Sequence, residues 1–89
     1  MLLSVAPLGE FYNCNEDTTV YFDPASGDTH LLSNFAAYLL RQLAVQPMDI
    51  EQLITRIAPD IDPQDIPELS RHVPDVIAEL AALDVIAEL

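Results

Sequence analysis

The chain has 89 residues, which allows one domain with a modest core, and 51% of its residues are hydrophobic, more than a disordered acidic segment carries. Three arginines stand against fifteen acidic residues, there is no lysine, and the formal net charge is −12. Nucleic-acid binding requires Lys and Arg to neutralise phosphates, so this composition argues against DNA, RNA and anionic lipid as partners.

The sequence also gives evidence on the cellular compartment of the protein. No run approaches the roughly 20 apolar residues that a membrane-spanning helix needs. Residues 1–9 lack the basic segment and the sustained apolar stretch of a secretory signal, so we expect none. One cysteine, Cys14, cannot form an internal disulfide and fits a reducing compartment. These features predict a cytoplasmic protein without membrane contact.

The first part of the chain is predicted to contain one short strand and an irregular segment. Residues 2–6 are mostly apolar and compatible with a strand. Residues 8–17 include Gly9, Asn13 and several acidic side chains, which break any regular period, so we expect no regular element there.

A β-hairpin is predicted next. Residues 18–22 are all β-branched or aromatic, which is the clearest strand signal in the chain. Pro24 presets the backbone for a turn, and Gly27 can adopt a positive φ without steric cost. A second strand at 28–32 follows at once, and two strands joined by a short Pro/Gly loop form a hairpin.

From Ser33 onward the hydrophobic period changes from two to 3.6, which predicts helices. Ser33 or Asn34 can cap the first helix, and Pro47 ends it. The second helix is expected to begin at Asp49, because Gln52 three residues later completes the pattern of a capping box.

The third helix is predicted over about residues 69–83 and is expected to be kinked, or begun afresh, at Pro74. Pro67 is expected to stop any helix that begins earlier. Residues 85–89 fit either an extension of this helix or a short strand. The predicted fold class is therefore α+β, with short N-terminal strands and a hairpin packed on three C-terminal helices. This is a winged-helix-like layout in a single domain over residues 1–89.

No catalytic, metal or cofactor site is predicted. His30, on a strand, is more often a packed or surface residue than a ligand, and Cys14 lies beside acidic residues that disfavour its thiolate. The three aspartates between residues 60 and 65 lack the glycine of a calcium loop, and no Gly-rich phosphate loop is present. We therefore expect a protein that is not an enzyme.

One motif carries a family resemblance. Residues 21–33, Tyr-Phe-Asp-Pro-Ala-Ser-Gly-Asp-Thr-His-Leu-Leu-Ser, resemble the strand–turn–strand of PqqD-like peptide chaperones, also called RiPP recognition elements, in the branch associated with HPr-kinase-related proteins. Residues 49–57 resemble the second helix of that family, and residues 80–86 resemble its closing Leu-x-x-Leu-Gly-Leu-Ile. The resemblance covers about residues 18–86. It departs at Asp84, where the family usually has the glycine that ends the helix.

The resemblance implies three strands packed on three helices, and a non-catalytic chaperone that presents the leader of a ribosomally synthesised precursor peptide to a modifying enzyme. The leader would add as a strand beside the outer strand of the hairpin, with its apolar side chains in a groove against the third helix. Carried onto this chain, the peptide-binding residues are Asp28, Thr29, His30, Leu31, Leu32, Val73, Val76, Ile77 and Leu80. Thr29 and His30 are further expected to hydrogen-bond the strand to the first helix.

Two other hypotheses follow from charge and layout. An acidic adaptor or inhibitor would occupy the basic surface of a partner protein. A winged-helix DNA-binding protein fits the order of elements, but the net charge contradicts it. An exposed strand edge can also pair with its twin, so a homodimer stays open.

Overall fold

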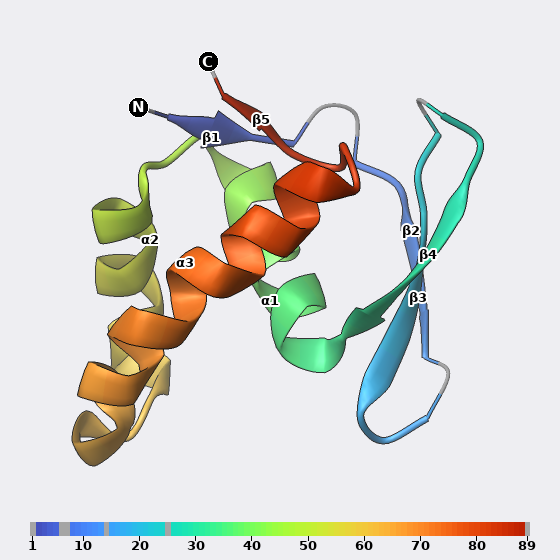
Figure 1. The fold of residues 1–89 in the computed structure, drawn as a ribbon. Helices are drawn as coiled ribbons and strands as arrows, with labels where there is room; N and C mark the ends of the chain where they lie inside the picture. The colour runs from blue at the N-terminus through green and yellow to red at the C-terminus, as the bar shows by residue number, and fades with distance from the viewer. Residues whose placement is uncertain (1, 6–7, 14, 25, 89) are drawn as a thin grey trace.

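The computed structural model describes residues 2–5, 8–13, 15–24 and 26–88. In it, short strands precede three helices, so the α+β class predicted from the sequence is confirmed (Figure 1). The elements are β1 (Leu3–Ser4), β2 (Glu10–Asn13), β3 (Thr18–Phe22), β4 (Thr29–Ser33), α1 (Asn34–Val45), α2 (Ile50–Ile57), η1 (Ala58–Asp60), η2 (Pro63–Asp65), α3 (Ile66–Ala82) and β5 (Ala87–Glu88).

The main sheet has three antiparallel strands in the order β2-β3-β4. The hairpin of β3 and β4 forms where it was predicted. Gly27 takes a positive φ of 77°, and its N–H donates to the Asp23 carbonyl at 2.8 Å. The expectation of an irregular segment over 8–17 is wrong for β2, because Phe11 and Tyr12 find a partner strand in β3. The predicted first strand is shorter than expected, and Ala6 lies outside the described residues.

One face of this sheet is packed against α1. Tyr21 is buried there, with its ring centroid 4.9 Å from that of Phe11, and Arg41 of α1 lies 4.3 Å from the Phe11 ring centroid. The Tyr21 hydroxyl accepts a hydrogen bond from the Gly9 N–H at 2.9 Å, and burial raises the pKa of Tyr21. Gly9 has to be glycine, because a Cβ there would overlap the carbonyl oxygen of Phe22.

The caps of the first two helices confirm the sequence prediction. The Ser33 hydroxyl accepts from the Ala36 N–H at 3.1 Å and begins α1. Asp49 and Gln52 form a complete capping box at the start of α2. Both caps satisfy N–H groups that the first turn of a helix leaves without an intrahelical partner.

The third helix differs from its prediction. It begins at Ile66, before the expected start at 69, because Pro67 lies in the first turn, where the N–H that proline lacks has no helical acceptor. It then continues through Pro74 as one helix. Val73, Val76 and Ile77 are buried on either side of Pro74, and this packing holds the helix against the local loss of a hydrogen bond.

α3 ends at Ala82, so Asp84, which stands where the resembled motif has glycine, does not let the helix run on. This residue has a φ of 59°, its N–H donates to the Ala81 carbonyl at 3.0 Å, and the Val85 N–H donates to the Leu80 carbonyl at 3.3 Å. These two bonds form a Schellman motif, in which aspartate takes the position that glycine usually holds. The chain then leaves the helix, and β5 pairs with β1. Of the two alternatives for this segment, a helix extension or a short strand, the described residues therefore form the strand. Leu89 lies outside the described residues.

The core lies among the helices and beneath the sheet. α1 is its centre, since it contacts β3 and β4 on one side and α2 and α3 on the other (Figure 1). The largest fully buried side chains are Tyr21, Leu39, Leu40, Leu43, Met48, Leu53, Ile57, Leu80 and Val73. Every helix in the described part of the chain is too short or too polar to cross a bilayer.

Candidate functional site

The sheet has two outer strands, β2 and β4, and the β4 edge is the one that continues into α1. Among the described strands, β4 pairs only with β3, and the C-terminal strand β5 pairs with β1 at the other end of the molecule (Figure 1). The described C-terminal strand therefore pairs with β1 and not with the β4 edge. An uncovered strand edge presents backbone N–H and C=O groups that can pair with another chain.

The register of the hairpin shows which backbone groups of β4 face outward. The Asp23 N–H donates to the Asp28 carbonyl at 2.9 Å, and the Asn34 N–H donates to the Asp17 carbonyl at 3.1 Å, so Asp28 and Asn34 both bond toward the partner strand. In an antiparallel pair this direction alternates along the strand. His30 and Leu32 therefore bond to β3.

It follows that Thr29, Leu31 and Ser33 direct their backbone groups to the free edge. The carbonyl of Ser33 is used as the N-cap of α1, which leaves its N–H for the edge. The available groups are thus the N–H and C=O of Thr29 and Leu31 and the N–H of Ser33. These groups set the register in which an added strand would pair.

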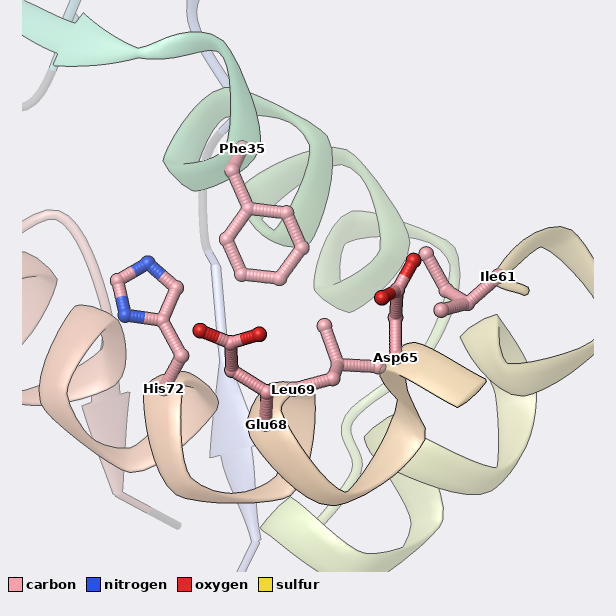
Figure 2. A pocket seen from close by; sticks show the side chains of 6 residues that line it. All are labelled: Phe35, Ile61, Asp65, Glu68, Leu69 and His72. Atoms are coloured by element: carbon pink, nitrogen blue, oxygen red, sulfur yellow. The ribbon is translucent and has the colours of Figure 1, made fainter. Parts of the chain in front are cut away.

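A hollow lies where this edge meets the helices. It has a volume of about 430 Å³ and is lined by Phe35, Ile61, Asp65, Glu68, Leu69 and His72. Phe35 follows the last residue of β4 by two positions, and Figure 2 shows its ring directed toward the first turns of α3. Phe35 thus connects the hollow to β4 along the chain, while no residue of β4 itself lines the hollow.

Phe35 and His72 line the hollow as stacked rings, and Tyr38 stacks on Phe35 outside the lining. The Phe35 ring centroid lies 5.5 Å from that of His72 and 6.4 Å from that of Tyr38, with interplanar angles of 20° and 29°. The Tyr38 hydroxyl donates to the Asp60 carboxylate at 3.0 Å, and burial together with this hydrogen bond raises the pKa of Tyr38. Asp60 thus ties the η1 segment to α1 beside the hollow.

The strand residues predicted to bind peptide divide between two faces. Asp28 stands just before β4, and the side chains of Thr29 and Leu31 are exposed on the outer face. Those of His30 and Leu32 point to the buried face, where Leu32 is part of the core. The Nε2 atom of His30 is buried and has no hydrogen-bond partner among the described residues.

The predicted bond from Thr29 or His30 to the first helix is absent from the described residues. Asn34 makes this connection instead. Its side-chain oxygen accepts from the Thr19 hydroxyl at 2.7 Å, and its amide nitrogen donates to the Glu16 carbonyl at 2.6 Å. A residue at the start of α1 is better placed to reach the hairpin than a side chain that points across the sheet.

The helix residues predicted as a groove wall lie in the core. Val73, Val76, Ile77 and Leu80 are each at most 5% exposed, and none of them lines the hollow beside Phe35. The wall comes from the earlier turns of α3, through Glu68, Leu69 and His72 (Figure 2). The helix residues that line the hollow therefore come before the helix residues that were predicted to bind peptide.

Sequence reasoning misses Asp65 and Glu68 because it expects Pro67 to stop any helix that begins before residue 69, and it places the groove wall at Val73 and beyond instead of at Leu69 and His72. Asp65, Glu68, Leu69 and His72 are spaced at i, i+3, i+4 and i+7, which places them on one side of a helix. Reading Pro67 as a first-turn residue would have exposed this pattern. Phe35 carried a signal too, since it lies at i with Leu39 and Leu43 at i+4 and i+8, a spacing that places it on the apolar side of the first helix.

Other chemistry finds little support in the described residues. Among them, no three His, Asp or Glu side chains gather where a metal ion could be held, and Cys14 lies outside the described part. No protein-family model, curated protein or solved structure matches the chain. Membership of the PqqD-like family therefore stays a prediction from the hairpin motif, and the functional argument rests on the geometry of the site.

Proposed function

We propose that the chain is a non-catalytic peptide-binding domain that receives an extended segment of another chain as a fourth strand beside β4. The observation that carries this proposal is the set of outward N–H and C=O groups of Thr29 and Leu31, on a strand that is followed two residues later by Phe35 of the hollow. Main-chain bonds along the edge would supply affinity, and the side chain that enters the hollow would supply specificity.

The magnitudes fit a modest but useful affinity. Five outward backbone groups allow up to five hydrogen bonds, each with a net contribution of about 0.5–1.5 kcal/mol. The apolar part of the hollow, formed by Phe35, Ile61 and Leu69, adds the burial of a guest side chain. Its volume of about 430 Å³ lies in the range of ordinary small-ligand pockets.

The hairpin motif suggests the biological guest. By its resemblance to PqqD-like chaperones, the guest would be the leader of a ribosomally synthesised precursor peptide, and the domain would present it to a modifying enzyme in the cytoplasm. The −12 charge supports this role to the extent that it limits pairing of one β4 edge with another copy.

Amide hydrogen exchange tests strand addition directly. Peptides would be selected from a displayed library of random 12-residue sequences, and exchange would be followed by NMR with and without the selected peptide. We expect new protection at the amides of Thr29, Leu31 and Ser33, with His30 and Leu32 unchanged because they already bond to β3. A bound peptide that protects all five amides equally, or none of them, would refute addition at this edge.

The outer face of the sheet supports a second candidate, the acidic adaptor. Tyr12, Val20 and Leu31 lie side by side across the three strands, and Tyr12 and Leu31 are 54% and 64% exposed. An apolar row on an acidic domain suits a partner with a basic surface. Amide exchange separates the two candidates, because a partner on the outer face leaves the amides of Thr29, Leu31 and Ser33 unprotected, whereas strand addition protects them.

A further inference from the structure

Two carboxylates border the apolar part of the hollow. In Figure 2 the side chains of Asp65 and Glu68 extend from α3 toward the space near Phe35, with Leu69 between them in the view. Both residues are exposed, so their carboxylates are hydrated in the free protein. A guest side chain that covers Leu69 would meet both of them.

Neither carboxylate is neutralised within the structure. Among the described residues, Asp65 and Glu68 have no side-chain hydrogen bond or ion pair. Arg71 lines a neighbouring hollow together with Glu68, but it makes no ion pair with a described carboxylate. Asp65 stands at the N-cap position of α3 without making a capping bond through its side chain. The two charges are therefore available to a guest.

We propose that this hollow selects an arginine side chain of the guest peptide, an inference that rests on the peptide-binding function proposed above. The methylene stem of arginine can lie over Ile61 and Leu69 while its guanidinium reaches the carboxylates. The planar guanidinium also stacks on aromatic faces and binds carboxylates through two parallel bonds, which a lysine ammonium cannot do. A purely apolar side chain would cover Ile61 and Leu69. It would also displace water from the two carboxylates without offering them a hydrogen-bond donor in its place.

The charge of the whole domain favours the same guest. With three arginines against fifteen acidic residues, the surface attracts a cationic peptide and repels an acidic one. Long-range electrostatic attraction alone would not determine at which position of the peptide the arginine is required. Asp65 and Glu68 determine that position, because they line the same hollow as Phe35, two residues beyond β4.

Synthetic peptides test the inference. The peptide selected from the random library would be made with arginine, citrulline, lysine, leucine or glutamate at the position that enters the hollow, and binding would be measured by calorimetry. Citrulline has nearly the shape of arginine without its charge. We expect arginine to bind about tenfold more tightly than citrulline, the size typical of a charge-assisted hydrogen bond at a partly exposed site.

Variants of the protein test whether Asp65 and Glu68 cause the preference for arginine. In the double variant Asp65→Asn/Glu68→Gln, we expect the preference for arginine over citrulline to fall below about twofold, consistent with the loss of both charge-assisted contacts. Asparagine keeps a side chain that is favourable at an N-cap, so α3 should still form. The matched control Glu51→Gln/Glu79→Gln removes the same charge from exposed residues that do not line this hollow and should keep the preference.

The outcomes distinguish this inference from the proposed function. If peptides bind along β4 but arginine and citrulline bind equally well, arginine selection is refuted and strand addition stands. A preference that persists in Asp65→Asn/Glu68→Gln, or disappears in the control, assigns selection to overall charge and also refutes the inference. If no peptide from the library binds, the proposed function fails, and arginine selection fails with it.

Discussion

Replacing Leu31 with proline is the sharpest perturbation of the β4 edge. Proline removes one backbone N–H and fixes φ, and at position 31 this N–H points away from β3. The Leu31 side chain is 64% exposed, so little burial is lost. Proline is tolerated on edge strands with its nitrogen toward solvent, so we expect the free energy of unfolding to change by no more than about 1 kcal/mol.

The same substitution should be severe for binding. The guest loses one hydrogen bond, with a net value of about 1 kcal/mol, and its carbonyl is left unpaired beside the proline ring, which costs about 1–3 kcal/mol more. Together these losses weaken binding by at least about tenfold. Calorimetric titration with the selected 12-residue peptide measures the change, and urea unfolding of the same sample measures stability.

Two matched variants separate the backbone from the side chain. Leu31→Thr keeps the N–H and a strand-forming side chain, so its affinity should stay within about threefold of the wild type if the edge bond dominates. Leu32→Pro removes an N–H directed at β3 and a core side chain, and should destabilise the fold by more than about 3 kcal/mol. A folded Leu31→Pro protein with unchanged affinity would refute strand addition at β4.

Three further predictions concern stability. His30→Leu should raise the free energy of unfolding by about 1 kcal/mol, because the buried Nε2 atom lacks a partner among the described residues; an unchanged or lower thermal midpoint would contradict this. Asp84→Gly should stabilise by about 0.5–1 kcal/mol by relieving the positive φ, seen as a higher urea midpoint with an unchanged m-value. Burial raises the pKa of Tyr21 in the folded protein, so the stability that its neutral phenol contributes is present below about pH 10, the unfolded value, and is lost as pH rises through the folded pKa. Urea unfolding at stepped alkaline pH should therefore show a steeper decline for the wild type than for Tyr21→Phe, and equal slopes would contradict this cause.

The parts of the fold that sequence predicted correctly are those whose signals are local. Ser33 and Asp49 cap their helices through bonds to residues three positions away, so the pattern and the structure report the same interaction. The hairpin turn depends on the conformation of Gly27, which the residue type alone allows. Such features are readable because partner and signal lie within one turn of the chain.

The parts that were missed depend on distant partners or on the context of a proline. β2 has one half-buried aromatic and three exposed residues, so its sequence alone does not show that β3 is available to pair with it. Pro67 and Pro74 carry opposite meanings in a first turn and in a helix interior, and only the position of the helix start decides between them. The earlier start also matters for the hollow, since Asp65 and Glu68, which line it, lie before the predicted start at 69.

In the proposed function, the joint between β4 and α1 would make the edge and the hollow act together. Ser33 is both the last residue of the strand and the N-cap of the helix, so one residue offers an N–H to the edge and fixes the direction of the turn that carries Phe35. Asn34 then holds this turn to the hairpin through its bonds to Thr19 and Glu16. The separation between the last edge amide and the hollow is therefore set at two residues by the covalent chain and held by hydrogen bonds. A guest that pairs with Leu31 and Ser33 has its register fixed before its side chain meets the hollow, so backbone pairing and side-chain selection reinforce each other.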